Sequence, residues 1–281
     1  MTVALRPRSL DEALRYLADD PGLVPTAGCT DLMVRGPEAL HRMDRVIDLL
    51  GIPALRGIRE VDGGIEIGAI TTFTEIGRSP AIRAAFPALA EAAGQIGGWQ
   101  IQNRATLGGN LANASPAGDS LPVLLALDAV VVAAGAGGLR EIPYSVFHTG
   151  YRKTALQPGE IVAKVRLPVP PEDTLQAFRK VGTREAQAIS KVVVAMAGRI
   201  AEGRIVELRL AAGSVAPTPV RLRAAEEAVR GMEAGLEAAN LAGQEAGREV
   251  TPIDDVRSTA DYRRFVLERV VRRMVLGCPR R

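Results

Sequence analysis

The 281-residue sequence contains few cysteine, histidine and aromatic side chains. Two cysteines, Cys29 and Cys278, imply no disulfide framework, and with two histidines they make a metal site improbable. An iron–sulfur cluster normally takes four thiolates, so this chain cannot hold one by itself. Aromatic residues make up 4% of the sequence, which argues against stacking platforms for nucleic-acid bases. The composition therefore disfavours a metalloprotein and a protein that binds single-stranded nucleic acid.

Long apolar runs and a strong excess of one charge are also missing. No stretch is long enough to span a bilayer. The first seven residues lack the charged-then-apolar pattern of a signal peptide. The net charge is +3, with acidic and basic residues interleaved, which does not favour nucleic acid as a partner. With so few cysteines, the expected compartment is the cytoplasm.

Length and hydrophobic content predict a globular protein of two domains. The chain exceeds the usual domain length of about 150 residues, and its hydrophobic content of 47% is sufficient for a core. The run Pro168-Val169-Pro170-Pro171 indicates a linker, because prolines stiffen and extend a connection. We therefore expect one domain over residues 1–171 and a second over residues 172–281.

Capping residues, glycine turns and apolar periodicity predict a mixture of helices and strands. Capping boxes begin at Ser9 and Thr72, and the last helix has Ser258 as its expected N-cap. Helices are expected over residues 10–18, 81–96 with a break near 87, 121–127, 219–230, 232–248 and 261–276. In the last of these, the expected apolar positions are Phe265, Val266, Val270 and Met274. Strands are expected over 23–26, 44–49, 58–61, 65–69, 129–133, 160–167, 175–181, 192–200 and 204–212.

The segment over residues 101–120 gives the strongest indication of function, and we interpret it as a loop. Gly108 and Gly109 remove the Cβ atoms that would keep a ligand away from the main chain. Successive N–H groups in such a loop can form a concave anion site, and Asp119 is an acceptor suited to a sugar hydroxyl. The segment predicts a phosphate-bearing cofactor that is bound by backbone N–H groups. A plain surface loop is the alternative interpretation.

A second glycine turn lies in the same predicted domain, at Ala27-Gly28-Cys29-Thr30-Asp31-Leu32. Two such turns suit a dinucleotide, because its diphosphate offers phosphates to separate loops. Neither turn matches G-x-G-x-x-G after a strand or G-x-x-x-x-G-K-[ST]. A dinucleotide would therefore bind on a scaffold other than the doubly wound one.

Both turns also resemble those of a known family. The first turn is similar to part of the FAD-binding subunit of molybdenum hydroxylases. Four further segments resemble the same subunit: Asn103-Arg104-Ala105-Thr106-Leu107-Gly108-Gly109-Asn110, Ser115-Pro116-Ala117-Gly118-Asp119-Ser120, Phe147-His148-Thr149-Gly150-Tyr151-Arg152-Lys153-Thr154 and Gly213-Ser214-Val215-Ala216-Pro217-Thr218. That family includes xanthine dehydrogenase and aerobic carbon monoxide dehydrogenase. The resemblance covers nearly the whole chain. It implies an α+β fold: a two-lobed vanillyl-alcohol-oxidase-type FAD-binding domain, with lobes of about 1–56 and 57–171, followed by a smaller α+β C-terminal domain.

The resemblance also implies a set of FAD-binding residues, and no catalytic acid, base, nucleophile or metal ligand. The two glycine turns would wrap the diphosphate, Asp119 would bind the adenosine side, Val162 would pack near the flavin, and Lys180 would reach the cofactor. Without the resemblance, Lys180 reads as a solvated strand residue. The full set is Thr26, Ala27, Gly28, Cys29, Thr30, Asp31, Leu32, Ile101, Ala105, Thr106, Gly108, Gly109, Asn110, Asp119, Val162 and Lys180. Cys29 departs from the family, where a second glycine is frequent, and its thiol is either reactive or a small packing group.

By resemblance, the chain is an electron-transfer flavoprotein subunit of a heterotrimer. A large molybdopterin subunit would hydroxylate the substrate, a small subunit would carry [2Fe-2S] clusters, and electrons would leave through FAD to NAD⁺, oxygen or another acceptor. In such a protein the cofactor supplies the redox chemistry and the chain supplies binding and tuning. Two alternatives stay open: a stand-alone flavin-dependent reductase on a related scaffold, and a flavin-free assembly subunit.

Overall fold

The computed structural model describes residues 3–34, 36 and 43–277, and its first lobe is a small parallel sheet. Strands β1 (Val3–Leu5), β3 (Arg45–Asp48) and β2 (Val24–Thr26) pair in that order. Helix α1 (Leu10–Asp19) follows β1, α2 (Thr30–Val34) follows β2, and the 3₁₀ turns η1 (Leu49–Gly51) and η2 (Pro53–Leu55) follow β3. The α1 cap differs slightly from a capping box, because the Glu12 carboxylate accepts from the Arg8 N–H.

The second lobe is an antiparallel sheet covered by short helices. Its strands are ordered β4 (Ile58–Val61), β5 (Gly64–Gly68), β10 (Ile161–Pro168), β6 (Val130–Gly135) and β7 (Gly138–Pro143). Between β5 and β6 run α4 (Phe73–Arg78), α5 (Pro80–Ala85), α6 (Pro87–Gln95), α7 (Trp99–Gln102), α8 (Leu107–Asn113) and α9 (Leu121–Ala126). After β7 come η3 (Tyr144–Val146) and a hairpin of β8 (His148–Gly150) and β9 (Lys153–Thr154). The predicted hairpin over 58–69 and the capping box of Thr72 and Glu75 are confirmed.

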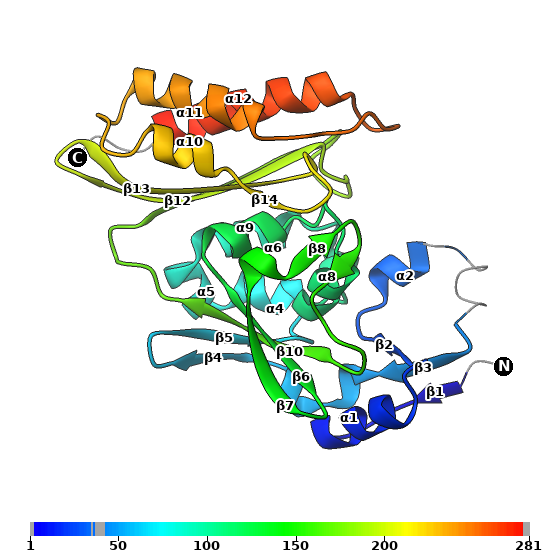
Figure 1. Ribbon diagram of the computed structural model, residues 1–281. Helices are drawn as coiled ribbons and strands as arrows, with labels where there is room; N and C mark the ends of the chain where they lie inside the picture. The colour runs from blue at the N-terminus through cyan, green and yellow to red at the C-terminus, as the bar shows by residue number, and fades with distance from the viewer. Residues whose placement is uncertain (1–2, 35, 37–42, 278–281) are drawn as a thin grey trace.

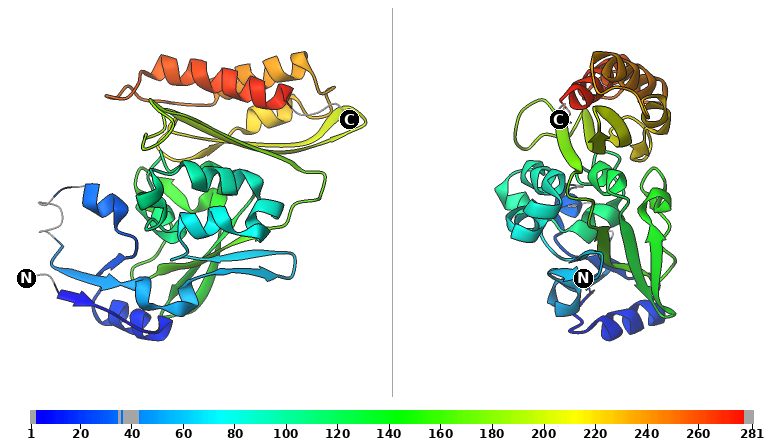
Figure 2. Two further views of the ribbon diagram at one scale, coloured as in Figure 1. Left: turned by 180° about the vertical axis from the view of Figure 1, so that it is seen from behind. Right: turned by 90° about the vertical axis from the view of Figure 1, so that its left-hand side faces the viewer.

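The C-terminal part is a sheet with a layer of helices on its outer face (Figure 1). Strands β11 (Leu175–Val181), β12 (Val192–Ala201), β13 (Arg204–Gly213) and β14 (Val220–Arg221) pair in sequence order. Helices α10 (Arg223–Ala228), α11 (Leu236–Arg248) and α12 (Ala260–Leu276) cover one face, and α6 and α9 lie against the other. Figure 2 shows the same order of layers from two further directions.

Strand β12 explains why this sheet holds the two parts of the protein together. Val193 and Ala195 belong to the core shared with the first domain, while Val194 and Met196 face the outer helices. Successive side chains of a strand point to opposite faces, so a strand buried on both faces reads as a continuous apolar run. The run from 192 to 197 is therefore the sequence signature of this junction.

Three sequence-based expectations about helices were wrong in detail. The segment over 101–120 is not simply a loop, because α7 and α8 occupy much of it. The segment expected to be helical from 219 begins with the short strand β14. Helix α12 is capped by Thr259 rather than Ser258, and it buries Leu267, Val271 and Val275 instead of Phe265, which is half exposed. The other three expected positions, Val266, Val270 and Met274, are partly buried against the same core.

None of the helices in the described part of the chain combines the length and the apolarity needed to cross a bilayer.

Candidate functional site

The first glycine turn connects β2 to α2 and lies directly against the second lobe. The Thr26 hydroxyl, buried at the end of β2, donates to the Ile47 carbonyl at 3.1 Å and fixes the strand end. A Cβ atom at Gly28 would lie 2.0 Å from the Arg104 carbonyl oxygen and 3.0 Å from the Ala105 Cα. Only glycine permits such an approach of two backbones. The two predicted turns therefore meet at Gly28.

The first turn also has free backbone donors. The Met33 N–H of α2 donates to the Cys29 carbonyl at 3.0 Å. In the described part of the chain, the N–H groups of Gly28, Cys29 and Thr30 have no acceptor. Unpaired N–H groups in a tight turn form a concave site that attracts anions. The first turn therefore offers N–H donors of the kind that anion sites use.

The second turn differs, because its backbone donors are already used. At the start of α8, the Leu107 N–H donates to the Thr71 carbonyl and the Gly108 N–H to the Ala69 carbonyl, at 3.1 and 2.8 Å. The Gly109 N–H donates to the Thr106 hydroxyl at 3.2 Å. The expectation that successive N–H groups of this turn are free to bind an anion was therefore wrong. These bonds instead fix α8 against the β5 end of the sheet.

The two adjacent glycines of the second turn have different roles. A Cβ at the buried Gly108 would lie 2.6 Å from the Ala69 Cβ, so this glycine permits close packing of α8. A Cβ at the exposed Gly109 would come within 4 Å of the Thr106 hydroxyl alone, at 2.8 Å. Gly109 is therefore the residue that leaves open space on the outer side of the turn.

Asn110 and Asp119 belong to one connected structure. The Asn110 side-chain oxygen accepts from the Ser120 hydroxyl at 2.8 Å, which ties α8 to the turn before α9. Asp119, next to Ser120, is 7% exposed. This hydrogen bond holds the carboxylate at the boundary with the C-terminal sheet.

Asp119 and Lys180 form a buried ion pair between the two parts of the protein. The Lys180 Nζ of β11 lies 2.6 Å from the Asp119 Oδ2 and donates also to the Gln95 carbonyl at 2.8 Å. Their side chains are 8% and 4% exposed for Asp119 and Lys180, so the interpretation of Lys180 as a solvated residue was wrong. Burial raises the pKa of Asp119 to about 6, although the Lys180 charge opposes that shift.

One oxygen of this pair lacks a partner. The Asp119 Oδ1 atom is buried and accepts no hydrogen bond in the described chain. The neighbouring Ser190 hydroxyl lies near enough to lower the pKa of Asp119, and it also lies 3.4 Å from the Ala117 carbonyl and 2.9 Å from the Ser214 hydroxyl. A buried acceptor without a donor is costly. A ligand hydroxyl could satisfy it if the carboxylate turned towards the ligand.

The remaining predicted residues lie around these groups with different degrees of burial. Ala105 is buried, and its carbonyl accepts from the Phe73 N–H at 3.1 Å. Ile101 of α7 is partly buried against the first-domain core. Val162 is 5% exposed, in the same core, beside an irregularity in the pairing of β10 with β6. The place of Val162 near the flavin stays a prediction.

Cys29 is a poor candidate for a reactive thiol. Its thiol donates to the Ala27 carbonyl at 3.3 Å, and burial, followed by the charge of Asp48, raises its pKa. A raised pKa keeps the thiol protonated and unreactive at neutral pH. The backbone of Cys29 has φ of 60°, which is left-handed. This conformation accounts for the frequency of glycine here in the family that the sequence resembles.

Comparison with known proteins identifies this arrangement. Residues 1–170 match the family described as "FAD binding domain in molybdopterin dehydrogenase", and residues 176–278 match the "CO dehydrogenase flavoprotein C-terminal domain". This chain belongs to the FAD-binding subunits of the molybdenum hydroxylase family. Its fold is the two-lobed vanillyl-alcohol-oxidase-type FAD-binding domain followed by a smaller α+β domain, as the resemblance implied.

Relatives of this FAD-binding subunit are similar over almost their whole length. The chain is 32% identical to the putative xanthine dehydrogenase FAD-binding subunit of Escherichia coli K12, covering 96% of this chain and 93% of the relative. It is also 32% identical to the carbon monoxide dehydrogenase medium chain of Hydrogenophaga pseudoflava, covering 95% and 93%. A structure of carbon monoxide dehydrogenase from Hydrogenophaga pseudoflava superposes with a TM-score of 0.93 at 31% identity, over 97% and 95% of the two chains.

FAD fits the residues present in this subunit. The free N–H groups of the first turn suit the negatively charged diphosphate, and the close approach at Gly28 brings this turn against Arg104 and Ala105, which precede the second turn. The unpartnered oxygen of Asp119 suits a ribose hydroxyl. No group of three metal-ligating side chains occurs among residues 3–34, 36 and 43–277.

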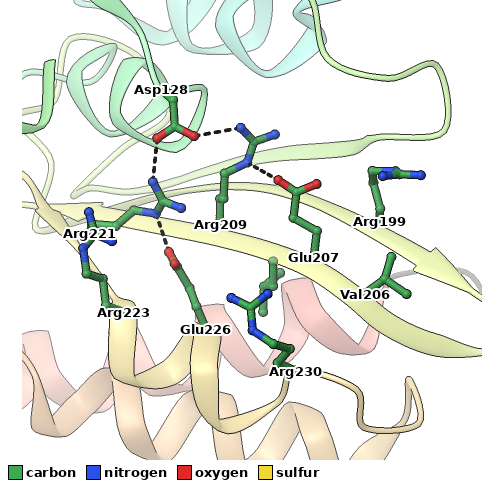
Figure 3. Close-up of a pocket in the computed structure, with 10 residues that line it drawn as sticks. Asp128, Arg199, Val206, Glu207, Arg209, Arg221, Arg223, Glu226 and Arg230 are labelled. Carbon is green, nitrogen blue, oxygen red and sulfur yellow. Dashed lines mark hydrogen bonds and ion pairs between the residues drawn. The ribbon is translucent and has the colours of Figure 1, made fainter. Parts of the chain in front are cut away.

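A charged hollow of about 440 Å³ lies elsewhere in the subunit, at the junction of α9 with the C-terminal sheet (Figure 3). Asp128, which follows α9, binds Arg209 and Arg221 at 2.9 and 2.8 Å, and these arginines also pair with Glu207 and Glu226. The five residues form an alternating network in which every charge has an opposite neighbour. We interpret this hollow as part of the domain junction, since it contains none of the predicted FAD-binding residues.

Sequence reasoning missed two groups that position the site. The Gln95 carbonyl, at the end of α6, binds Lys180, and Arg152, between β8 and β9, contacts Asp31 and Asn113. A main-chain acceptor leaves no signal in residue types. Arg152 lies within the quoted family motif, but only the fold reveals that it reaches both glycine-turn segments.

Proposed function

We propose that this FAD-binding subunit is the electron-transfer flavoprotein of a heterotrimeric molybdenum hydroxylase in the cytoplasm. It would receive electrons from [2Fe-2S] clusters of a small partner subunit, after substrate oxidation on a large molybdopterin subunit. It would deliver them to NAD⁺, oxygen or another acceptor. When bound, FAD supplies the redox chemistry, and the chain supplies binding and orientation.

The observation that supports this proposal most is that the chain offers donors for a diphosphate but has too few cysteines for an iron–sulfur cluster. The first turn offers free N–H donors to a diphosphate, whereas the whole sequence has two cysteines against the four thiolates that a cluster normally takes. Electrons must therefore arrive from a cluster on another chain. Relatives have names that point the same way, among them a nicotine 6-hydroxylase medium subunit and carbon monoxide dehydrogenase medium chains.

We propose the following placement of FAD, with a domain boundary between residues 171 and 172. The diphosphate would lie on the first turn, Thr26 to Leu32, with Gly109 leaving room on the opposite side. Asp119 and Lys180 would act together near the adenosine, Asp119 accepting from a ribose hydroxyl. Ile101, Ala105, Thr106, Gly108, Asn110 and Val162 would shape the surrounding wall.

Anaerobic electron transfer from a reduced partner subunit tests this function without knowledge of the substrate. The purified chain is loaded with FAD and mixed with the iron–sulfur subunit, previously reduced with dithionite and freed of excess reductant. The expected result is loss of the visible absorbance of oxidised flavin together with reoxidation of the clusters. Flavin that stays oxidised in the assembled complex would refute the electron-transfer function while leaving FAD binding intact.

A further inference from the structure

One arginine side chain connects the two glycine-turn segments. Arg152 lies between β8 and β9, and its Nη1 atom donates to the Asn113 side-chain oxygen at 2.7 Å. The same atom lies 3.7 Å from the Asp31 Oδ2. Asn113 ends α8, which follows the second turn, and Asp31 lies in the first turn of α2, which follows the first glycine turn.

The hairpin that carries Arg152 is itself fixed to α8. The His148 Nε2 atom of β8 lies 2.9 Å from the Leu111 carbonyl, and its Nδ1 atom lies 3.2 Å from the hydroxyl of the buried Tyr144. Arg152 has φ of 52°, a left-handed conformation that is unfavourable for a non-glycine residue. The hairpin is therefore held in a strained but well-supported position from which the arginine reaches α2.

Helix α2 needs such a tie because it is poorly packed. None of its residues is buried, and Met33 and Val34 are 65% and 81% exposed. The helix stands beside α8 in Figure 1, and the two belong to different lobes. The first turn itself approaches the second lobe at Gly28. A charged contact at Asp31 adds a second point of attachment at the start of this helix.

We propose that Arg152 is a positioning residue that holds the first glycine turn and α2 against α8 and thereby slows the release of FAD. This inference rests on FAD being the ligand of the two turns. Arg152 acts through Asp31 and Asn113 rather than by chemistry on the flavin. Because the diphosphate would bind N–H groups of the same turn, movement of α2 away from α8 would open one side of the bound cofactor.

The test compares Arg152→Ala with a matched control, Arg199→Ala. Arg199 pairs with Asp173 at 2.9 Å, with a similar exposure of 34% against 39% for Arg152, but lies in the C-terminal sheet. Each variant is loaded with FAD and diluted, and release is followed by the rise in FAD fluorescence. We expect Arg152→Ala to release FAD about fivefold to tenfold faster than the wild type, and Arg199→Ala to match the wild type.

Two further measurements separate positioning from general destabilisation. The thermal midpoint of the apoprotein should change equally in both variants, and Asp31→Asn should add little to the effect of Arg152→Ala on release. FAD release at the wild-type rate from Arg152→Ala would overturn the proposal. If the wild-type chain cannot be loaded with FAD at all, the assignment of the cofactor to the glycine turns fails instead.

Discussion

Replacing either partner of the Asp119–Lys180 pair is expected to have unequal effects. In Asp119→Asn, the Lys180 ammonium stays buried beside the Gln95 carbonyl and an amide oxygen, but without the negative charge that neutralises it. Breaking a buried pair in this way costs about 3–5 kcal/mol of unfolding free energy. This cost is expected at pH 7, where the Asp119 carboxylate of the wild type is mostly ionised and neutralises the Lys180 charge.

Lys180→Met should lower the unfolding free energy by less at neutral pH, because the Asp119 carboxylate can take up a proton and become neutral. Asp119 has a pKa of about 6, so at pH 7 its neutral form lies only about 1.4 kcal/mol above the ionised form. Without Lys180 the folded-state pKa rises further above the unfolded value, and the folded state retains a proton that the unfolded state has lost. Stability then falls as pH rises, by about 1.4 kcal/mol per pH unit above pH 6 relative to wild type.

Urea unfolding of the apoproteins at several pH values measures both effects. At pH 7, the expected losses are about 3–5 kcal/mol for Asp119→Asn and about 1–2 kcal/mol for Lys180→Met. Near pH 5, the second loss should almost vanish. Equal losses in the two variants, or a loss in Lys180→Met that does not change with pH, would refute the argument that burial controls this carboxylate.

Three further predictions concern the glycine turns and the hairpin. Gly109→Ala should change the unfolding free energy of the apoprotein by less than about 1 kcal/mol but weaken FAD binding about tenfold. Gly28→Ala should instead lower the unfolding free energy by at least about 2 kcal/mol, because its Cβ would meet backbone atoms. Urea unfolding and FAD titration that give the same pattern for both variants would contradict this. Cys29→Gly should stabilise the apoprotein by up to about 1 kcal/mol, by relieving the left-handed conformation, and a lower thermal midpoint would oppose that reasoning. Burial lowers the pKa of His148, so the unfolded state binds more protons and this histidine should reduce the stability of the wild type below about pH 6.5. His148→Gln should lose less stability than the wild type over the same range, and parallel pH profiles of the two proteins would rule this histidine out as the cause.

Local sequence signals predicted the elements that depend on local chemistry. The turn of the hairpin over 58–69, the Thr72–Glu75 capping box and the strand pair over 192–212 follow from turn residues, caps and apolar runs, and the structure confirms them. The positions of α12 that are fully buried, Leu267, Val271 and Val275, were not predictable in this way, because the neighbouring expected positions Val266, Val270 and Met274 are apolar too and are partly buried against the same core. Contact with α11 and β12 selects among them.

Residue types alone did not reveal which parts of the two turns are available to a ligand. Both turns contain glycine, threonine and a side-chain amide or carboxylate, so they look equivalent in sequence. The strand end at Ala69 and the carbonyl of Thr71 accept the N–H groups that open α8, and these partners lie far away along the chain. Availability of a donor depends on long-range contacts, which explains why the second turn was misjudged.

Long-range contacts also bring a side chain of the C-terminal sheet to Asp119. Lys180 comes from β11, yet its charge is neutralised by a carboxylate of the first domain. Ser190, also from the C-terminal part, lies near that carboxylate, and its hydroxyl is hydrogen-bonded to the Ser214 hydroxyl and to the Ala117 carbonyl of the first domain. A C-terminal domain that served only as a docking module would have no need to place a lysine there. Because the pair is buried, any movement between the two domains must separate two charges, so under the proposed placement of FAD its binding would be energetically linked to the domain arrangement.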